Sequence, residues 1–345
     1  MKAMGFNRHG TSEVIEEAEL KDPAPENGEV LVRLKSTSVN RLDILVREGI
    51  HGMQLGMPHV PGSDILGTVE KNGENAGMFS QGDLVLGNTV YGCGTCDKCA
   101  AGNENLCMQW KCIGLHVNGT YGELISVPER ILSPAPKTYS EDELAALPLD
   151  LSVAWRALHT LSNAQTGETV LVRGASGNVG IFAIKLARAM GLNVIAATRS
   201  AEKESMLKAA GADSVISAAD AISIKNAVMS ATQDRGADII IETMGRPLDE
   251  SVNLAAYSGR IVAFGTIAGA ESSINVRRLY LRNISILGMH NASKHEFDDA
   301  LEFAIKKGIR PAIAKKLPIT DAAEAQRCLE SSAYFGKIIL QHKNW

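Results

Sequence analysis

Six short aliphatic runs in the second half of the chain alternate with helical segments, and this alternation constrains the fold more than any other feature. The runs cover residues 169–173, 193–197, 214–217, 238–242, 260–264 and 284–288. Helical segments such as 180–190 and 201–210 lie between them, and each is followed by a glycine, Gly191 or Gly211, of the kind that ends helices. Parallel strands need crossover connections of this length, so the alternation predicts an α/β fold with a doubly wound, six-stranded parallel sheet.

The first of these runs leads into a glycine-rich turn and then a helix. Glycines allow the backbone to turn sharply and to approach a pyrophosphate, whose charge then lies against free amides at the helix N-terminus. Alone, the pattern also fits an ordinary turn before a packed helix, but the strand, turn and helix context favours a dinucleotide site. The residues predicted to form it are Gly174, Ala175, Ser176, Gly177, Asn178, Val179 and Gly180.

The end of the next run indicates which nicotinamide cofactor binds. Sites for NAD usually place a carboxylate there for the ribose hydroxyls. This chain has Thr198, Arg199, Ser200 and then Lys203, which suit a 2′-phosphate and predict NADP(H). The alternative is that Arg199 and Lys203 are solvated residues at a helix start.

Four of the six cysteines lie close together, with the spacing C-x2-C-x2-C-x7-C, at Cys93, Cys96, Cys99 and Cys107. Four thiolates in a loop-rich lobe, here residues 91–112, predict one closed, structural Zn²⁺ site. Alternatives are a disulfide pair, free core cysteines or an iron–sulfur cluster. The N-terminus lacks the apolar segment of a secretory signal, which disfavours disulfides.

The charge balance excludes some partners. The chain has 35 Lys plus Arg against 39 Asp plus Glu, a net charge of −4, and no long basic run, so neither nucleic acid nor an anionic membrane surface is expected as a partner. No uninterrupted apolar stretch reaches the roughly 18 residues of a membrane span. These features predict a soluble, cytoplasmic protein that acts on a small molecule.

The N-terminal part, up to about Pro136, reads as a β-rich module because short alternating runs such as 29–34 are bounded by Gly and Pro. Beyond the sixth run follow helical segments 293–307 and 320–330 and a strand-like run 336–340. Such a short tail rarely folds alone, so we expect it to return to the N-terminal module. The predicted domains are 1–147 with 290–345, and 148–289.

These features, in this order, resemble the medium-chain dehydrogenase/reductase superfamily, which contains zinc alcohol dehydrogenases, quinone reductases and enoyl-thioester reductases. The resemblance extends over essentially the whole chain and includes the segments VNRLD (39–43), VPGSDILG (60–67), AWRAL (154–158) and FGK (335–337). It implies a GroES-like catalytic domain built from both chain ends and a Rossmann domain, with the active site in the cleft facing the latter. It also implies a homodimer or homotetramer.

The departures from the family pattern concern the catalytic metal. At the positions that correspond to its ligands in the zinc alcohol dehydrogenases, this chain has Asn40, Ser63 and Leu149. None is a competent zinc ligand. The catalytic metal is therefore predicted to be absent, although Asp64 and Asp150 are carboxylates that could still attract an ion.

Without a Lewis acid, reduction of an activated C=C or a quinone is easier than reduction of a simple ketone. The sequence therefore predicts an NADPH-dependent oxidoreductase acting on an enone, a quinone or a short enoyl thioester such as acryloyl or crotonyl. One alternative is an alcohol dehydrogenase or aldehyde reductase with a metal recruited through Asp64 or Asp150. The other is a non-catalytic NADPH-binding or quinone-sensing protein.

Two residues are predicted to be catalytic. Asn40 would donate a hydrogen bond to the substrate oxygen. His51 falls where the similar enoyl-thioester reductases carry a tyrosine proton donor, and it could equally be a solvated loop histidine. Asp43 and Arg47 are expected to form an internal ion pair. The predicted pocket residues are Asp43, His59, Asp64, Leu149 and Trp155.

Further cofactor contacts are expected at the carboxyl ends of the fourth and fifth runs. They are Thr243, Gly245, Phe264, Gly265 and Thr266. The resemblance adds Gly288 and Met289 near the nicotinamide ring and Lys337 on its far side.

Overall fold

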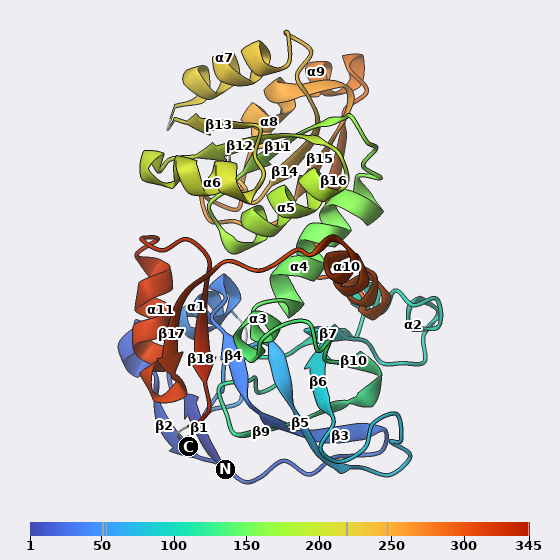
Figure 1. The fold of residues 1–345 in the computed structure, drawn as a ribbon, viewed down its shortest axis with the longest axis vertical. Coiled ribbons are helices and arrows are strands. Elements are labelled where there is room, and N and C mark those ends of the chain that lie inside the picture. Colours follow the sequence, from blue (N-terminus) through green and yellow to red (C-terminus); the bar gives the residue numbers. More distant parts are fainter. Residues whose placement is uncertain (50–51, 53, 219, 247, 344) are drawn as a thin grey trace. The chain divides into compact units, whose positions relative to one another are not determined.

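The computed structural model describes residues 1–49, 52, 54–218, 220–246, 248–343 and 345. The chain forms two compact units, shown in Figure 1. The first unit comprises Met1–Leu149, Asn291–Leu301 and Arg310–Trp345, and the second comprises Asp150–His290 and Glu302–Ile309. The division differs from the expected one chiefly at residues 302–309, which belong to the second unit.

The second unit is built on a six-stranded sheet in the order β13-β12-β11-β14-β15-β16, with every neighbouring pair parallel. This confirms the predicted doubly wound Rossmann sheet. Its central strands are buried on both faces, which explains their continuous aliphatic runs: all of β11 is buried, and Ile239, Ile240 and Ile241 of β14 are fully inaccessible. The strands are β11 (Thr169–Arg173), β12 (Asn193–Thr198), β13 (Ser214–Ser217), β14 (Ala237–Glu242), β15 (Ala255–Ala263) and β16 (Ser285–Gly288).

Helices cover both faces of this sheet (Figure 1). Helices α5 and α6 contact each other on one face, and α7, α8 and α9 form a contacting row on the other. Gly211, with φ of 119°, ends α6 in the left-handed conformation that the sequence predicts. The helical elements are the π-helix η4 (Arg156–Leu161), α5 (Asn178–Ala189), the 3-10 turn η5 (Ala201–Lys203), α6 (Glu204–Ala210), α7 (Ala221–Ala231), α8 (Leu248–Leu254) and α9 (Val276–Leu281).

The first unit is rich in β-structure, as expected for a GroES-like domain. Its largest sheet has the antiparallel order β10-β6-β5-β3-β9, and smaller sheets pair β1 with β2, β7 with β8, and β17 with β18 and β4. The strands are β1 (Lys2–Gly5), β2 (Glu16–Glu19), β3 (Glu29–Leu34), β4 (Ser36–Ser38), β5 (Ile65–Asn72), β6 (Leu84–Gly87), β7 (Val90–Tyr91), β8 (Lys111–Cys112), β9 (Leu124–Pro128), β10 (Leu132–Pro134), β17 (Ile313–Pro318) and β18 (Lys337–Gln341).

Short helices connect these strands. Two helices, α4 (Pro148–Trp155) and α10 (Lys294–Lys307), are divided between the units. The others in the first unit are η1 (Ser12–Val14), α1 (Arg41–Glu48), α2 (Asp97–Ala100), η2 (Glu104–Leu106), η3 (Glu129–Ile131), α3 (Glu141–Ala145), η6 (Ile319–Asp321) and α11 (Ala322–Glu330).

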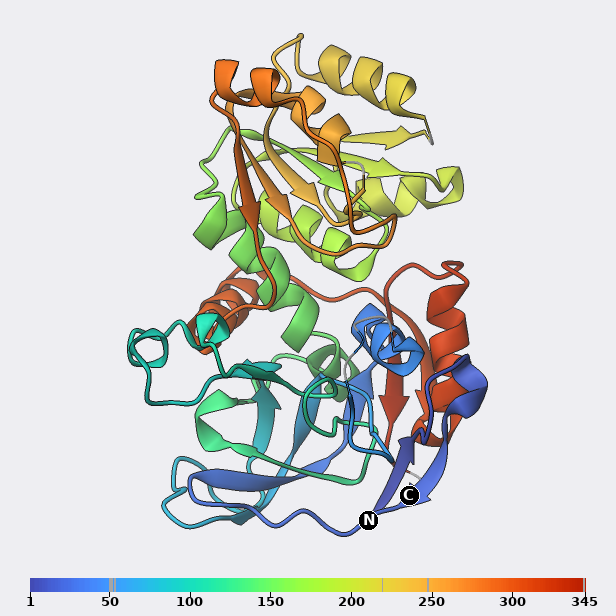
Figure 2. The ribbon, with the colours of Figure 1, turned by 180° about the vertical axis from the view of Figure 1, so that it is seen from behind.

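The C-terminal tail joins the N-terminal strands within the first unit (Figure 2). Strand β18 pairs antiparallel with β4, with Ile339 opposite Ser38. A buried cluster then combines both ends of the chain, for example Ala3, Val39 and Ile338. This pairing brings the start of β18 next to the residues that precede α1. Among the described residues, no helix combines the length and the apolar character needed to cross a membrane.

Candidate active site

Residues far apart in the sequence meet around the carboxylate of Asp64 in the first unit. Asn40, which precedes α1, donates from Nδ2 to Asp64 Oδ2 at 2.8 Å. The backbone amide of Leu149 donates to Asp64 Oδ1, also at 2.8 Å, and the Ser38 hydroxyl donates to Oδ2. Asp64 is completely buried. Burial of a carboxylate is tolerated only where such donors and a compensating charge replace water.

The compensating charge is the ammonium group of Lys337. Its Nζ lies 3.2 Å from Asp64 Oδ2 and donates to Asn40 Oδ1 at 2.7 Å. The Lys337 side chain is 1% exposed. The resemblance predicts a cofactor contact for this lysine, whereas the structure places its ammonium in the buried network of the first unit.

The three positions that the resemblance aligns with the family's metal ligands do come together. Ser63 Oγ lies 3.4 Å from Asn40 Nδ2, and Leu149 reaches the same carboxylate as Asn40. Leu149 contributes only a backbone amide to this group. Asn40 and Ser63 are buried as well, at 3% and 0% exposure, because the sheet containing β4 and β18 covers the start of α1.

Asp43 lies behind this network, one turn into α1. Its Oδ2 accepts from the Asn40 amide at 2.9 Å and from the Tyr121 hydroxyl at 3.1 Å. Burial raises the pKa of the Asp43 carboxyl to about 7, and the negative charge of Asp64 acts in the same direction. The hydrogen bonds from Asn40 and Tyr121 and the charge of Lys337 lower the pKa, but less than burial raises it.

The expected ion pair between Asp43 and Arg47 is wrong for the described residues. The buried Arg47 guanidinium binds Glu330 at 2.6 Å and Glu48 at 3.0 Å. It also donates to Gln326 Oε1 at 2.8 Å. Asp43 is turned toward the N-terminal end of α1, where the Asn40 amide needs an acceptor, whereas Arg47 extends toward α11.

The raised pKa of Asp43 predicts a specific pH dependence of stability. Below about pH 4 the Asp43 carboxyl is neutral in both the folded and the unfolded chain, so its full contribution to the free energy of unfolding is present there. As the pH rises, the unfolded chain releases this proton first, which favours unfolding. The contribution is therefore lost as the pH rises through about 7. Asp43→Asn should remove this loss. Urea unfolding at pH 5, 6, 7 and 8 should show the wild-type unfolding free energy falling relative to the variant, by on the order of a few kcal/mol.

The control for that series is Asp299→Asn, which changes an exposed carboxylate on α10. Its pH curve should run parallel to that of the wild type. Parallel curves for Asp43→Asn and the wild type would contradict the assignment.

Two further predicted pocket residues, His59 and Trp155, contact residues of the unit to which each belongs. His59 is buried, its Nε2 lies 3.0 Å from the Gly114 carbonyl oxygen, and burial lowers its pKa. Trp155, in the second unit, stacks on His159 with ring centroids 4.4 Å apart and packs against Phe303. His51, the predicted proton donor, lies outside the described residues.

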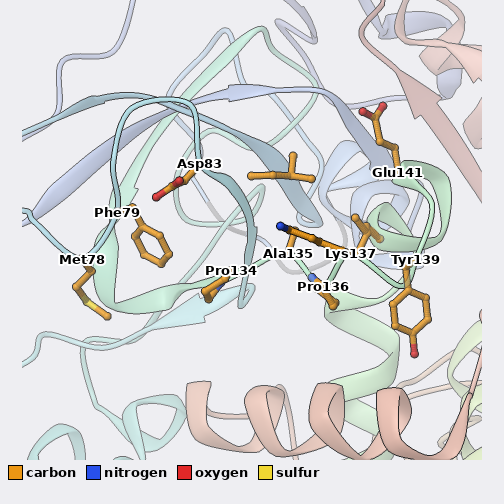
Figure 3. Close-up of a pocket in the computed structure, with 11 residues that line it drawn as sticks. Met78, Phe79, Asp83, Pro134, Ala135, Pro136, Lys137, Tyr139 and Glu141 are labelled. Carbon is orange, nitrogen blue, oxygen red and sulfur yellow. The ribbon is translucent and has the colours of Figure 1, made fainter.

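A separate cavity of about 430 Å³ opens in the first unit (Figure 3). Its lining includes Met78, Phe79, Pro134, Lys137 and Tyr139, and none of the predicted site residues. Figure 3 shows charged groups and apolar side chains side by side around it, without a convergent set of catalytic groups. We therefore place the candidate site at Asp64 rather than at this cavity.

The four lobe cysteines converge, as predicted. Their sulfur atoms all lie within 4.8 Å of one another, and three of the separations are 3.6, 3.7 and 3.9 Å. A tetrahedral zinc with Zn–S bonds of about 2.3 Å requires sulfur separations of about 3.8 Å. All six cysteines are free thiols in this structure, so the disulfide alternative is not supported. The set of donors fits a closed zinc site.

In the second unit, the glycine turn has the geometry of an anion cradle. A Cβ at Gly174 would lie 2.3 Å from Thr243 Oγ1, and one at Gly180 would lie 2.6 Å from the Gly174 carbonyl oxygen, so both positions require glycine. At the start of α5, the Ile181 amide donates to the Gly177 carbonyl oxygen at 2.9 Å. The amides of residues 178–180 therefore lie at the open helix end, where a pyrophosphate can bind.

The predicted 2′-phosphate residues differ in exposure. Thr198 and Lys203 are buried, Ser200 is half-buried, and Arg199 is exposed. Burial lowers the pKa of Lys203. The Thr198 hydroxyl accepts from the Ser200 amide at 3.1 Å, which shapes the turn that carries Arg199. Arg199 forms no side-chain hydrogen bond or ion pair with the described part of the chain, so its guanidinium is available to a ligand.

The loops after β14 and β15 meet, as the fold requires. Thr243 Oγ1 donates to the Arg173 carbonyl oxygen at 2.9 Å. Gly245 has φ of 85°, and a Cβ there would lie 2.9 Å from the Gly265 carbonyl oxygen. Phe264 and Met289 are half-buried, whereas Gly265, Thr266 and Gly288 are exposed, so this set lines the carboxyl edge of the sheet.

Sequence reasoning missed a buried ion pair at the same sheet edge. Arg173 ends β11 and Glu242 ends β14; Arg173 Nε lies 3.3 Å from Glu242 Oε2. Ser251 joins them by donating to Glu242 at 2.6 Å and accepting from Arg173 at 3.0 Å. In the sequence, each of two apolar runs ends in a single charged residue, Arg173 or Glu242. These residues can be recognised as an ion pair only once the two strands are known to be neighbours in the sheet.

Comparison with known proteins agrees with both units. Residues 26–137 match the family model described as an alcohol dehydrogenase GroES-like domain, and residues 178–306 match the one described as a zinc-binding dehydrogenase. The acryloyl-coenzyme A reductase of Metallosphaera sedula is 29% identical over 342 residues, covering 99% of each chain. The quinone oxidoreductase of Rattus norvegicus is 30% identical over 349 residues, covering 99% of this chain and 97% of that protein.

A solved structure described as an NAD-dependent alcohol dehydrogenase superposes with a TM-score of 0.91 and 36% identity, over 99% of each chain. The chain therefore belongs to the medium-chain dehydrogenase/reductase superfamily, and it is an oxidoreductase of that family.

Proposed function

We propose that this protein is an NADPH-dependent reductase that transfers hydride to a conjugated C=C or a quinone without a catalytic metal. The observation that carries the proposal is the buried network around Asp64. Both carboxylate oxygens accept hydrogen bonds, Lys337 supplies a positive charge, and Leu149 supplies no ligand atom. These residues do not fit a catalytic zinc, because an ion would have to displace Lys337 and Asn40 from Asp64.

The chemistry of this site suits a conjugated acceptor. NADPH, when bound, supplies the hydride, and the acceptor oxygen then needs hydrogen bonds and a proton rather than a Lewis acid. Asn40 Nδ2 gives one hydrogen to Asp64, whereas its contacts with the Ser38 carbonyl and Ser63 hydroxyl oxygens are 3.4 Å long. Its second hydrogen can therefore be donated to the substrate. His51 stays a sequence-based prediction for the proton donor.

The relatives support the same acceptor class. One is named an acryloyl-coenzyme A reductase and another a quinone oxidoreductase, and each aligns with nearly the whole chain. Both names describe acceptors conjugated to a carbonyl group. An enone, a quinone or a short enoyl thioester is therefore the substrate class that we assign.

The cofactor would be held by the second unit. The turn 174–180 would hold the pyrophosphate and Arg199 the 2′-phosphate, and one structural zinc would be held by the four lobe cysteines. The predicted homodimer or homotetramer belongs to the same proposal. It is supported by the edge position of β16 and by exposed apolar side chains on β15 and α9, among them Tyr257, Val276 and Tyr280.

The test is an NADPH-oxidation screen with small quinones, enones and short enoyl thioesters, with NADH, aldehydes and ketones as comparisons. We expect turnover with at least one conjugated acceptor, one zinc per chain by metal analysis, and a loss of kcat of about 100-fold in Asn40→Ala. Two zincs per chain with aldehyde reduction would favour the alcohol dehydrogenase alternative. Tight NADPH binding without turnover would favour the sensing alternative.

A further inference from the structure

We infer that Lys337 is a positioning residue that takes over, within this pocket, the electrostatic role of the missing catalytic metal: it compensates Asp64 and holds the Asn40 amide in one orientation. The inference rests on the proposed function for the substrate contact of Asn40. It differs from the cofactor contact that the family resemblance implies for this lysine.

The first step concerns charge. Asp64 is fully buried, and the Lys337 ammonium, also buried, is the cation that the described residues bring to it, 3.2 Å from Oδ2. Asp43, another acid of the network, forms no ion pair with the described residues, and the charge of Lys337 acts on it as well. Removing the ammonium would leave Asp64 as an uncompensated buried charge, which proteins tolerate poorly.

The second step concerns direction. An asparagine amide has one acceptor side and one donor side. Lys337 Nζ donates to Asn40 Oδ1 at 2.7 Å and cannot accept, so it can face only the oxygen. The amide nitrogen must therefore point toward Asp64 and Ser63, and its second hydrogen is presented in a fixed direction.

The third step concerns the backbone. Lys337 is the first residue of β18, and β18 is held against β4 by pairing of Ile339 with Ser38. Ser38 itself binds Asp64 through its hydroxyl. Lys337 and the strand that leads to Asn40 therefore belong to the same sheet, so the pairing of β18 with β4 fixes the Lys337 backbone relative to Asn40.

The experiment compares Lys337→Met, Lys337→Arg, Asp64→Asn and the double variant Asp64→Asn/Lys337→Met, with Lys316→Met as the control. Lys316 is a half-exposed lysine on the neighbouring β17. The measurements are the thermal midpoint, the Kd for NADPH by fluorescence, the zinc content, and kcat and KM for the best acceptor from the screen.

We expect Lys337→Met to lower Tm by roughly 10 °C, and the double variant to recover at least half of that loss, because the buried charge is then gone. We expect kcat to fall about 100-fold in Lys337→Met and to remain low in the double variant, with the Kd for NADPH changed less than about threefold. Lys337→Arg should regain part of the rate, and Lys316→Met should match the wild type. Zinc should stay at one per chain throughout.

Two results would overturn the inference. A large rise in the Kd for NADPH with unchanged kcat would make Lys337 a cofactor ligand, and strictly additive losses of Tm in the double variant would show that Asp64 and Lys337 are not coupled. If the wild type turns over no acceptor, the proposed function fails, whereas the Tm cycle and NADPH binding still decide the role of Lys337. If Lys337→Met does not fold, the Arg variant and the double variant provide the same comparison.

Discussion

Replacement of Cys107 by alanine should reduce the zinc content from about one ion per chain to below about 0.1, and should lower Tm by roughly 10 °C. Cys107 is 2% exposed and lies among the other three lobe thiols. Its sulfur also accepts from the amides of Cys93 and Gln109, at 3.4 and 3.3 Å. Without the ion, the four thiols would no longer be linked, and few buried apolar side chains would stabilise the lobe.

The helical elements of this lobe contribute little to the core. Helix α2 buries none of its residues, and η2 buries only Asn105. A bound zinc ion would therefore be the main cross-link of residues 93–107, and we expect limited proteolysis to cut there in the variant or after chelation.

Cys328→Ser is the matched control, because Cys328 is a buried cysteine on α11 outside the four-cysteine group. It should keep its zinc. Full zinc content and an unchanged Tm in Cys107→Ala would rule out the structural site, and an iron signal in place of zinc would favour the iron–sulfur alternative.

The second large effect is expected at Arg199. Changing it to aspartate should lower kcat/KM with NADPH by about 100- to 1000-fold and leave the value with NADH equal or higher. The guanidinium stands exposed after β12 without a described partner, so it can pair with a 2′-phosphate. A carboxylate would repel that phosphate and could instead bind the ribose hydroxyls.

Arg235→Asp is the matched control, since it makes the same charge change at an exposed arginine two residues before β14, near the amino end of that strand. Its preference for NADPH should equal that of the wild type. An unchanged ratio of NADPH to NADH efficiency in Arg199→Asp would exclude Arg199 from cofactor selection and leave Ser200 or Lys203 to be tested.

Much of the fold could be predicted from local patterns. All six strands of the parallel sheet occur where the aliphatic runs predicted them, because strands buried on both faces need continuous apolar residues. The largest difference is β15, which begins at Ala255 rather than near residue 260. The segment 255–259 contains Ser258 with φ of 57° and Gly259, and such a break hides a strand from pattern reading.

The site was predictable only in part. The four cysteines and the glycine turn are short-range motifs, so their spacing alone indicates their chemistry. The network at Asp64 joins residues that are 273 and 297 positions apart in the chain, at Lys337 with Asp64 and Lys337 with Asn40. No periodicity links such positions, and the expected Asp43–Arg47 pair was wrong for the same reason: α11 brings Glu330 to Arg47 from 283 residues away.

By itself, the sequence predicted the order of elements, the glycine turn, the arginine after the second aliphatic run, the cysteine lobe and the replacement of the family's zinc ligands by Asn40, Ser63 and Leu149. These depend on residue type and on neighbours within a few positions. Only the tertiary structure decided what stands near those lost ligands: β18 pairs with β4 and so places the Lys337 ammonium against Asp64. A buried carboxylate such as that of Asp64 needs a compensating positive charge, and the packing of the two chain ends determines which residue supplies it.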